Sequence, residues 1–194
     1  MQPVPQRHEH CGRLQDREQR FIDPAMERAQ ALFAKKVRDD SKRPAVAARL
    51  RADLDGNGVA EADLVIEAII ENVEEKKKMY AALDGIVKKE AVFASNTSSI
   101  SIDRLAAAVG EGRRGRFVGM HFFSPVPVMP LIELIRGTAT SDATEAVIRS
   151  VAGALGKTVI VSADRPGFIV NRILMPFLAE AIRAFEEGLG TAED

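Results

Sequence analysis

His121 and Glu133 are the residues of this sequence whose types best suit proton transfer. His121 is the only histidine in the regular part of the chain, because His8 and His10 lie near the amino terminus. A carboxylate bonded to one imidazole nitrogen fixes the ring tautomer, and the other nitrogen can then take or give a proton near neutral pH. The alternative is a structural histidine in the core, with Glu133 bonded to nearby backbone. Spacing alone favours that structural alternative.

A second polar cluster, Asn96-Thr-Ser-Ser99, follows a short apolar run. Side chains at the carboxyl ends of parallel strands line the ligand crevice of open α/β sheets. Ser98 or Ser99 could equally cap a helix that starts near Ile102. Glu67, Glu71, Asn72 and Lys76 form a further polar group beside the preceding apolar run, and their spacing favours the start of a solvated helix over contact with a cofactor ribose.

Asn171 lies about one turn inside the last expected helix, among apolar neighbours. A buried amide needs a partner, which is either a ligand carbonyl or a backbone group across a domain junction. His8-Glu-His-Cys11 offers three of the four ligands of a structural zinc site, and no second cluster exists, so we expect no metal. The sequence has no Gly-x-Ser-x-Gly motif, which disfavours a serine hydrolase with a nucleophile elbow.

Short apolar runs that alternate with helical periodicity indicate an α/β sheet with helices on its faces. The turn signal Asp55-Gly-Asn-Gly58 precedes the first of these runs. We expect strands at residues 62–68, 91–95, 117–123, 131–135 and 158–161. We expect helices at residues 23–37, 74–83, 102–109 and 143–155.

The pattern changes after Pro166-Gly167 to one long helical run at residues 168–187 with a wide apolar stripe. Such a stripe needs partners, so we expect this run to be the first helix of an all-α domain. The expected organisation is therefore a disordered lead at 1–12, an α/β domain at 13–164 and the start of a helical domain at 165–194.

Composition excludes several classes of partner. The chain of 194 residues is 46% hydrophobic and 28% charged with a formal net charge of -1, so no global field attracts nucleic acid or an anionic membrane. The single cysteine, Cys11, forms no intrachain disulfide, and no apolar run is long enough to cross a bilayer. We therefore expect a cytoplasmic protein without a membrane span.

Six motifs, in this order and spacing, resemble the 3-hydroxyacyl-CoA dehydrogenase family. They are Asp63-Leu-Val-Ile-Glu-Ala68, Glu71-Asn72, Ser95-Asn-Thr-Ser-Ser99, His121-Phe-Phe-Ser-Pro125, Leu131-Ile-Glu133 and Pro166-Gly-Phe-Ile-Val-Asn-Arg172. The resemblance implies a Rossmann-like NAD-binding domain and NAD-dependent oxidation of (S)-3-hydroxyacyl-CoA to 3-oxoacyl-CoA in fatty-acid β-oxidation. Ser124, with the run Met129-Pro-Leu-Ile-Glu133, is similar to the multifunctional branch of the family.

The resemblance also implies a role for each candidate. His121 would be the general base that deprotonates the 3-hydroxyl, and Glu133 would orient it. Ser98 and Asn171 would hold the hydroxyl or the forming carbonyl. Asp16, after Leu14-Gln, would bind the adenosine ribose, although it could instead cap a helix. The remaining expected NAD contacts are Ala68, Glu71, Lys76, Asn96, Ser98 and Ser124.

The departure from the family lies at the amino end. The family begins with a strand, a Gly-x-Gly-x-x-Gly turn and a helix that receives the pyrophosphate, and Met1 to Gly12 contains none of them. We therefore expect a domain truncated at both ends that binds NAD poorly. The alternatives are a catalytically silent or structural fragment, and a dehydrogenase of the same build acting on a non-CoA hydroxy acid. The full-length protein is expected to be a homodimer or part of a β-oxidation complex.

Overall fold

The computed structural model describes residues 11–191 and 193, and the chain divides into two compact units, residues 1–60 and 61–194. His8, His10 and most of the expected lead lie outside the described residues. Gly12, which we placed in the lead, belongs to a strand. In the described part of the chain, no helix is long and apolar enough to span a membrane.

The first unit contains a short parallel pair of strands. Strand β1 (Gly12–Leu14) pairs with β2 (Leu50–Ala52), and helices α1 (Gln19–Lys36) and α2 (Arg43–Ala47) lie between them in sequence. The predicted turn after β2 is confirmed, since Gly56 has a φ of 70°. Strand β2 was not predicted, because a run of three residues is too short for apolar alternation to identify a strand.

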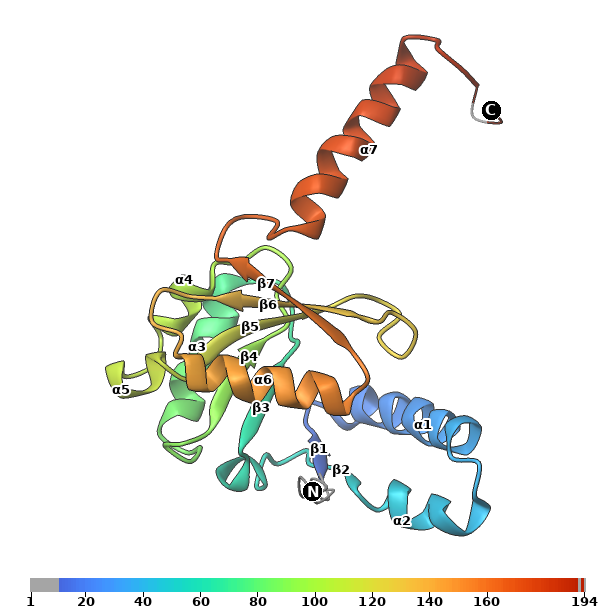
Figure 1. Cartoon of the computed structure of the whole chain (residues 1–194). Coiled ribbons are helices and arrows are strands. Elements are labelled where there is room, and N and C mark those ends of the chain that lie inside the picture. Colours follow the sequence, from blue (N-terminus) through green and yellow to red (C-terminus); the bar gives the residue numbers. More distant parts are fainter. Residues whose placement is uncertain (1–10, 192, 194) are drawn as a thin grey trace, which may run out of the picture. The chain divides into compact units, whose positions relative to one another are not determined.

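The second unit is built on a five-stranded sheet of order β3-β4-β5-β6-β7 (Figure 1). Its strands are β3 (Leu64–Glu67), β4 (Val92–Ser95), β5 (Phe117–Phe122), β6 (Leu131–Arg136) and β7 (Thr158–Ala163). All neighbours are parallel except β5 and β6, which are antiparallel. The Pro-rich segment between β5 and β6 reverses the chain without a crossover helix, a strand direction that the sequence had left open.

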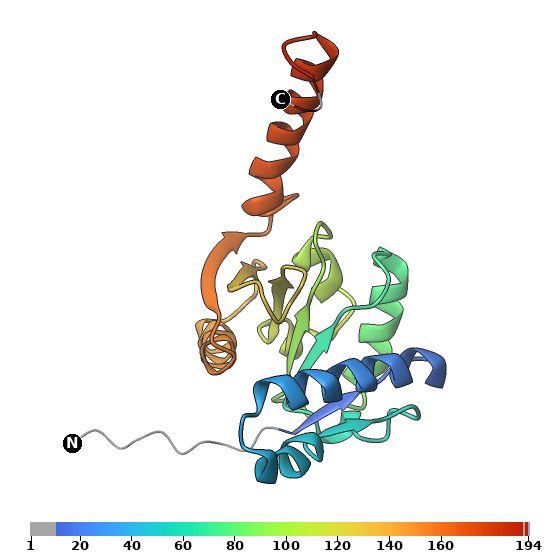
Figure 2. The same ribbon diagram turned by 90° about the vertical axis from the view of Figure 1, so that its right-hand side faces the viewer.

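Helices cover both faces of this sheet, as Figures 1 and 2 show. They are α3 (Val73–Asp84), α4 (Ile102–Ala106), α5 (Glu111–Arg114) and α6 (Asp142–Ala154). On one face, Ile148 and Ala152 of α6 join a buried cluster that includes Val92 and Ala94 of β4. On the other face, Tyr80 of α3 packs on Phe93 and Phe117, with ring centroids 5.4 and 4.6 Å away. Residues of β4 thus alternate between two cores, as expected of a central parallel strand.

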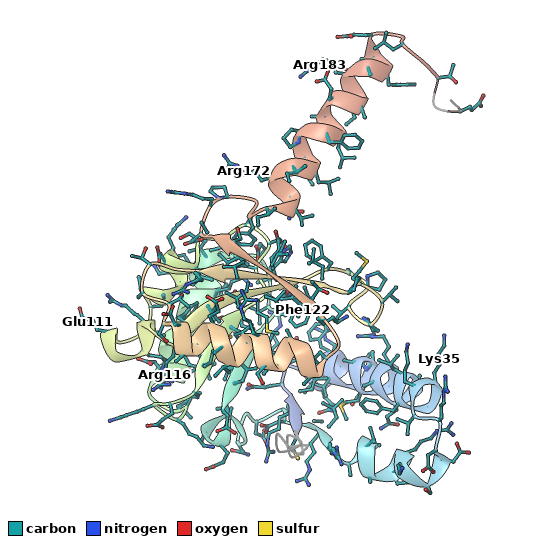
Figure 3. The ribbon with its side chains drawn as sticks, viewed as in Figure 1. Lys35, Glu111, Arg116, Phe122, Arg172 and Arg183 are labelled. Atoms are coloured by element: carbon teal, nitrogen blue, oxygen red, sulfur yellow. The ribbon has the colours of Figure 1, made fainter. Side chains whose placement is uncertain are left out.

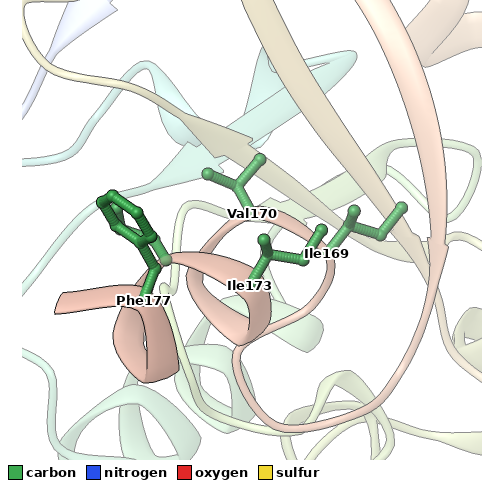
Figure 4. Close-up of a pocket in the computed structure, with 5 residues that line it drawn as sticks. Ile169, Val170, Ile173 and Phe177 are labelled. Carbon is green, nitrogen blue, oxygen red and sulfur yellow. The ribbon is translucent and has the colours of Figure 1, made fainter. Parts of the chain in front are cut away.

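The last helix, α7 (Val170–Glu186), has an exposed apolar surface (Figure 3). Ile173 and Phe177 are each 68% exposed, and they line a hollow formed by α7 itself together with Ile169, Val170 and Leu174 (Figure 4). The helix begins two residues later than predicted. The reason is that Gly167 and Phe168 have positive φ values of 76° and 48°, which a right-handed helix does not accept.

Candidate active site

His121 and Glu133 are direct partners across the antiparallel pair β5 and β6. Opposite residues of such a pair point to the same face of the sheet, so the strand register itself brings the two side chains together. The Nδ1 atom of His121 lies 2.8 Å from Oε2 of Glu133. Glu133 is fully buried and His121 is 5% exposed, so little water competes for this hydrogen bond.

The second carboxylate oxygen of Glu133 is bound by the amino end of α7. The backbone N–H groups of Ile169 and Val170 donate to Oε1 at 3.0 and 2.9 Å. First-turn N–H groups have no partner inside their own helix, and the helix dipole favours a negative charge there. The buried carboxylate is therefore compensated by three hydrogen bonds and a helix terminus.

The other nitrogen of His121 faces a polar side chain that lines a hollow. Nε2 lies 3.2 Å from Oγ of Ser98. Ser98 and Asn171 line the same hollow of about 410 Å³, together with Gly167 and Met175. Asn171 is half-buried rather than enclosed by apolar neighbours. The expected substrate-holding residues thus line one hollow, and Ser98 connects it to Nε2 of His121.

The loop 96–99 that carries Ser98 is held by Glu71. Oε1 of Glu71 accepts the Thr97 hydroxyl at 2.5 Å and the backbone N–H groups of Ser98 and Ser99 at 2.9 and 3.2 Å. Partial burial raises the pKa of Glu71, but the hydrogen bonds from Thr97 and Ser98 and the charge of Lys76 outweigh it, so that this pKa lies below 4.5. Glu71 is therefore an ionised anchor for residues 96–99, the serine loop.

Lys76 occupies a buried position rather than the solvated helix start that its sequence favoured. It is 1% exposed, and its Nζ contacts Oε1 of Glu67 at 2.5 Å, Oε2 of Glu71 at 3.3 Å and the carbonyl oxygen of Ile69 at 3.1 Å. For Lys76 the expectation of solvation was wrong, because two carboxylates inside the protein compensate its charge. The expected helix start is confirmed, since the exposed Asn72 caps α3. Each ammonium proton has an acceptor within the protein.

Glu67 extends this buried network toward the sheet. Its Oε2 accepts hydrogen bonds from the hydroxyls of Ser95 and Tyr80, at 2.7 and 3.3 Å. Burial and the neighbouring charge of Glu67 raise the pKa of Tyr80 well above its usual value. The Ser95 hydroxyl in turn accepts the N–H of Thr97 at 3.3 Å. Sequence reasoning gave Glu67 no role of its own, although it shares a motif with Ala68.

Three further candidates are exposed. Ala68 directly follows the carboxyl end of β3, and Ser124 follows β5. Asp16 lies in the first unit, where its Oδ1 accepts the N–H of Arg17 at 2.7 Å. It does not cap α1, whose N-cap is Glu18. Asn96 is half-buried, and its Oδ1 accepts the N–H of Phe122, which ties the serine loop to β5.

The alternative in which Ser98 or Ser99 caps the helix near Ile102 is excluded. Ser101 caps α4, with its hydroxyl accepting the N–H of Arg104. Asp164, which sequence reasoning did not single out, accepts the Ser101 hydroxyl at 2.7 Å and the N–H groups of Ile102 and Asp103 at 3.0 and 2.9 Å. Ser101 and Asp164 thus cap α4, and Ser98 and Ser99 do not.

The expectation that the whole sequence lacks a Gly-x-Gly-x-x-Gly spacing was wrong, because the spacing occurs at Gly110, Gly112 and Gly115. It does not follow a strand as a phosphate loop requires, because it encloses the short helix α5 before β5 begins. Arg113 of this helix is buried against Asp84 and the carbonyl oxygen of Val87. The three glycines therefore lie before the amino end of β5, at the end of the sheet opposite to the serine loop. Among the described residues, no cluster of three potential ligands could hold a metal ion.

Comparison with known proteins assigns the family. The family model described as "3-hydroxyacyl-CoA dehydrogenase, NAD binding domain" matches residues 7–165, and that of the "C-terminal domain" of the same enzymes matches 167–194. The chain belongs to the 3-hydroxyacyl-CoA dehydrogenase family. The predicted family and the NAD-binding Rossmann-like fold are thereby confirmed.

Relatives of this family member cover most of its length. A 3-hydroxybutyryl-CoA dehydrogenase of Bradyrhizobium diazoefficiens is 48% identical over 82% of this chain and 54% of its own, and a probable 3-hydroxybutyryl-CoA dehydrogenase of Deinococcus radiodurans is 42% identical over 93% and 65%. The crystal structure of (S)-3-hydroxybutyryl-CoA dehydrogenase PaaH1 from Ralstonia eutropha is 42% identical over 90% of this chain and 61% of its own, with a TM-score of 0.81. The chain thus spans between half and two thirds of these relatives. Membership in the multifunctional branch stays a prediction.

Proposed function

We propose that this chain carries the proton-transfer site of an NAD-dependent (S)-3-hydroxyacyl-CoA dehydrogenase. The reaction is oxidation of 3-hydroxyacyl-CoA to 3-oxoacyl-CoA, the dehydrogenase step of fatty-acid β-oxidation. The observation that carries this proposal is the arrangement Glu133–His121–Ser98, in which each imidazole nitrogen has its own polar partner. Membership in the dehydrogenase family supports it.

The geometry supports one direction of proton transfer. With Glu133 ionised, Nδ1 of His121 donates to Oε2, so Nε2 carries the free lone pair of the neutral ring. Nε2 therefore accepts the proton of the substrate hydroxyl, and the buried carboxylate stabilises the imidazolium that forms. Ser98 and Asn171, which line the hollow beside Nε2, hold the reacting oxygen.

The fit to NAD is partial. The exposed Ala68 and the half-buried Asn96, at the carboxyl ends of neighbouring parallel strands, suit the nicotinamide half of the cofactor. When bound, NAD+ supplies the hydride acceptor. Lys76 supports that surface through Glu71, and Asp16 is proposed for the adenosine ribose. Among the described residues no Gly-x-Gly-x-x-Gly turn follows a strand, so weaker NAD binding, by several kcal/mol on the scale of a few charge-assisted hydrogen bonds, stays a prediction for this chain.

Turnover and cofactor binding are to be measured separately. NADH formation from 3-hydroxybutyryl-CoA and from a long-chain homologue tests the reaction, and calorimetry with NAD+ tests binding. Loss of activity in His121→Ala with unchanged NAD+ binding would support the proposal. Activity that survives His121→Ala would reject the assigned base.

The same assay distinguishes the alternatives. Tight NAD+ binding without turnover of any acyl-CoA would favour a catalytically silent member of the family. Turnover of a free hydroxy acid in preference to its CoA thioester would favour the non-CoA alternative. The cytoplasmic location, the homodimer and the β-oxidation complex stay predictions for the full-length protein.

A further inference from the structure

The turn between β7 and α7 has an unusual backbone. Gly167 and Phe168 are consecutive residues with positive φ, 76° and 48°. Glycine accepts such a conformation readily, whereas a bulky side chain rarely adopts it. Phe168 is nonetheless buried, at 3% exposure, and its N–H donates to the carbonyl oxygen of Arg165 at 2.9 Å. Surrounding contacts therefore hold Phe168 in a conformation that it would not choose by itself.

This turn determines where the first N–H groups of α7 point. The two residues after Phe168, Ile169 and Val170, donate to Oε1 of Glu133 at 3.0 and 2.9 Å. With Oε1 occupied by two donors, Oε2 lies 2.8 Å from Nδ1 of His121. The backbone of the turn thus sets the orientation of the carboxylate that contacts the histidine.

The side chain of the same turn acts on the histidine directly. The Phe168 ring lies edge-on to the His121 ring, with centroids 5.8 Å apart, and Phe123 packs on the ring at 4.7 Å. Aromatic contacts at these separations restrict the orientation of an imidazole ring. One strained turn therefore contacts both members of the pair, Glu133 through backbone and His121 through a ring.

We propose that Gly167 and Phe168 are positioning residues that dock the amino end of α7 onto Glu133 and thereby hold His121 in the Nδ1–H tautomer. Docked, the turn keeps the lone pair of Nε2 directed at Ser98 and the hollow. Released, Glu133 loses two donors and its fixed orientation, and the ring is free to adopt the other tautomer. The inference rests on the proposed function only for the use of Nε2, because the tautomer is measurable without turnover.

The test is the ¹⁵N spectrum of the histidine ring nitrogens in the whole chain without substrate. The chain has three histidines, and the His121 signals are those that disappear in His121→Gln. In the unaltered protein we expect the Nδ1–H tautomer of His121, together with slow hydrogen exchange at Ile169 and Val170.

Gly167→Ala is the disruptive variant, and Gly156→Ala is its matched control. A Cβ at Gly167 would lie 3.1 Å from the backbone N of Arg172 in the first turn of α7, whereas a Cβ at Gly156 meets nothing within 4 Å. Both glycines have positive φ, 76° and 68°, so both substitutions introduce backbone strain of the same kind. We expect Gly167→Ala to shift the ring toward the Nε2–H tautomer and to raise exchange at Ile169 and Val170 about tenfold, while Gly156→Ala changes neither.

A second variant keeps the test decisive if Gly167→Ala does not fold. Phe168→Gly accepts the positive φ without strain but frees the turn and removes the ring. It should give a mixture of tautomers and faster exchange at the two amides. Unchanged tautomer and unchanged exchange in the variants that fold would overturn the proposal.

The outcome separates this inference from the proposed function. A tautomer shift in a chain that turns over no hydroxyacyl-CoA would support the positioning role and count against the dehydrogenase. A wild-type tautomer of Nε2–H, or one unaffected by Gly167→Ala, would overturn the positioning role even if NADH forms.

Discussion

Two glutamates act on opposite sides of His121, and they differ in how the protein holds them. Glu133 is fully buried, and its carboxylate is hydrogen-bonded to one ring nitrogen of His121 and to the backbone N–H groups of Ile169 and Val170. The side chain of Glu71 is 40% exposed and gathers the donors of the serine loop, beside Lys76. The buried carboxylate has one arrangement available, whereas the exposed one can exchange its partners for water. We infer that Glu133 sets the chemistry of the ring and that Glu71 sets the position of the loop.

Replacement of Glu133 should have the largest effect on the proposed reaction. In Glu133→Gln the amide oxygen faces the two helix N–H groups, so the NH2 group faces Nδ1 and the ring adopts the opposite tautomer, without a free lone pair at Nε2. We expect kcat to fall about 10³- to 10⁴-fold, the scale seen when the acid of a catalytic triad becomes an amide. The measurement is NADH formation. Glu180→Gln on α7, an exposed position, is the control, and a loss below tenfold in Glu133→Gln would contradict this role.

Replacement of Lys76, which is buried between Glu67 and Glu71, should have the next largest effect, a loss of stability. Lys76→Met leaves Glu67 buried without its cation, and breaking a buried ion pair costs about 3–5 kcal/mol. Urea unfolding followed by circular dichroism measures this change. Lys78→Met is the matched control, because Lys78 lies on the same helix with its side chain 75% exposed and ion-paired to Glu75. Equal losses in the two variants would contradict a buried charge at Lys76.

The sequence predicted one side of this comparison better than the other. The expected strands 117–123 and 131–135 are consecutive in the chain, so the strand pattern allowed contact between His121 and Glu133, but the family resemblance was needed to assign the pair. Residues 71 and 97–99 meet only because β3 and β4 are neighbours in register, which the apolar runs alone do not specify. Lys76 lies in the run Lys76-Lys-Lys78, where composition predicts exposure for all three residues.

Backbone strain was the feature least accessible from sequence. Pro166-Gly167 signals a turn, but nothing in the residue types indicates that Phe168 adopts a positive φ or that α7 begins at Val170. That conformation depends on the burial of the Phe168 ring against His121, which is a tertiary contact. The family resemblance was needed to choose roles for Ser98 and Asn171, because position alone left both a ligand contact and a structural role open for each.

Replacement of Glu71 should have a smaller effect than replacement of the buried residues Glu133 or Lys76. Glu71→Gln keeps an acceptor for Thr97 and Ser98 but loses the charge beside Lys76. After allowance for solvent screening, we expect a loss of about 1 kcal/mol in the free energy of unfolding and a decrease of about tenfold in kcat through a less ordered Ser98. Glu74→Gln, at a side chain 70% exposed, is the control. A loss as large as that of Glu133→Gln would remove the distinction between the two glutamates.

The smallest expected effect is a pH dependence that belongs to Glu71. Burial raises the pKa of this carboxyl, yet the Thr97 and Ser98 hydrogen bonds and Lys76 bring it below its ordinary value of 4.5 in the folded protein. A carboxyl whose pKa is lower in the folded than in the unfolded state contributes stability above the unfolded pKa, and this contribution disappears as the pH falls through the folded pKa. The free energies of unfolding of the unaltered protein and Glu71→Gln should therefore differ by a constant amount above pH 4.5 and converge below it. Urea unfolding across this range measures the difference, and curves that converge instead as the pH rises above 4.5 would show that the serine loop does not stabilise the ionised form.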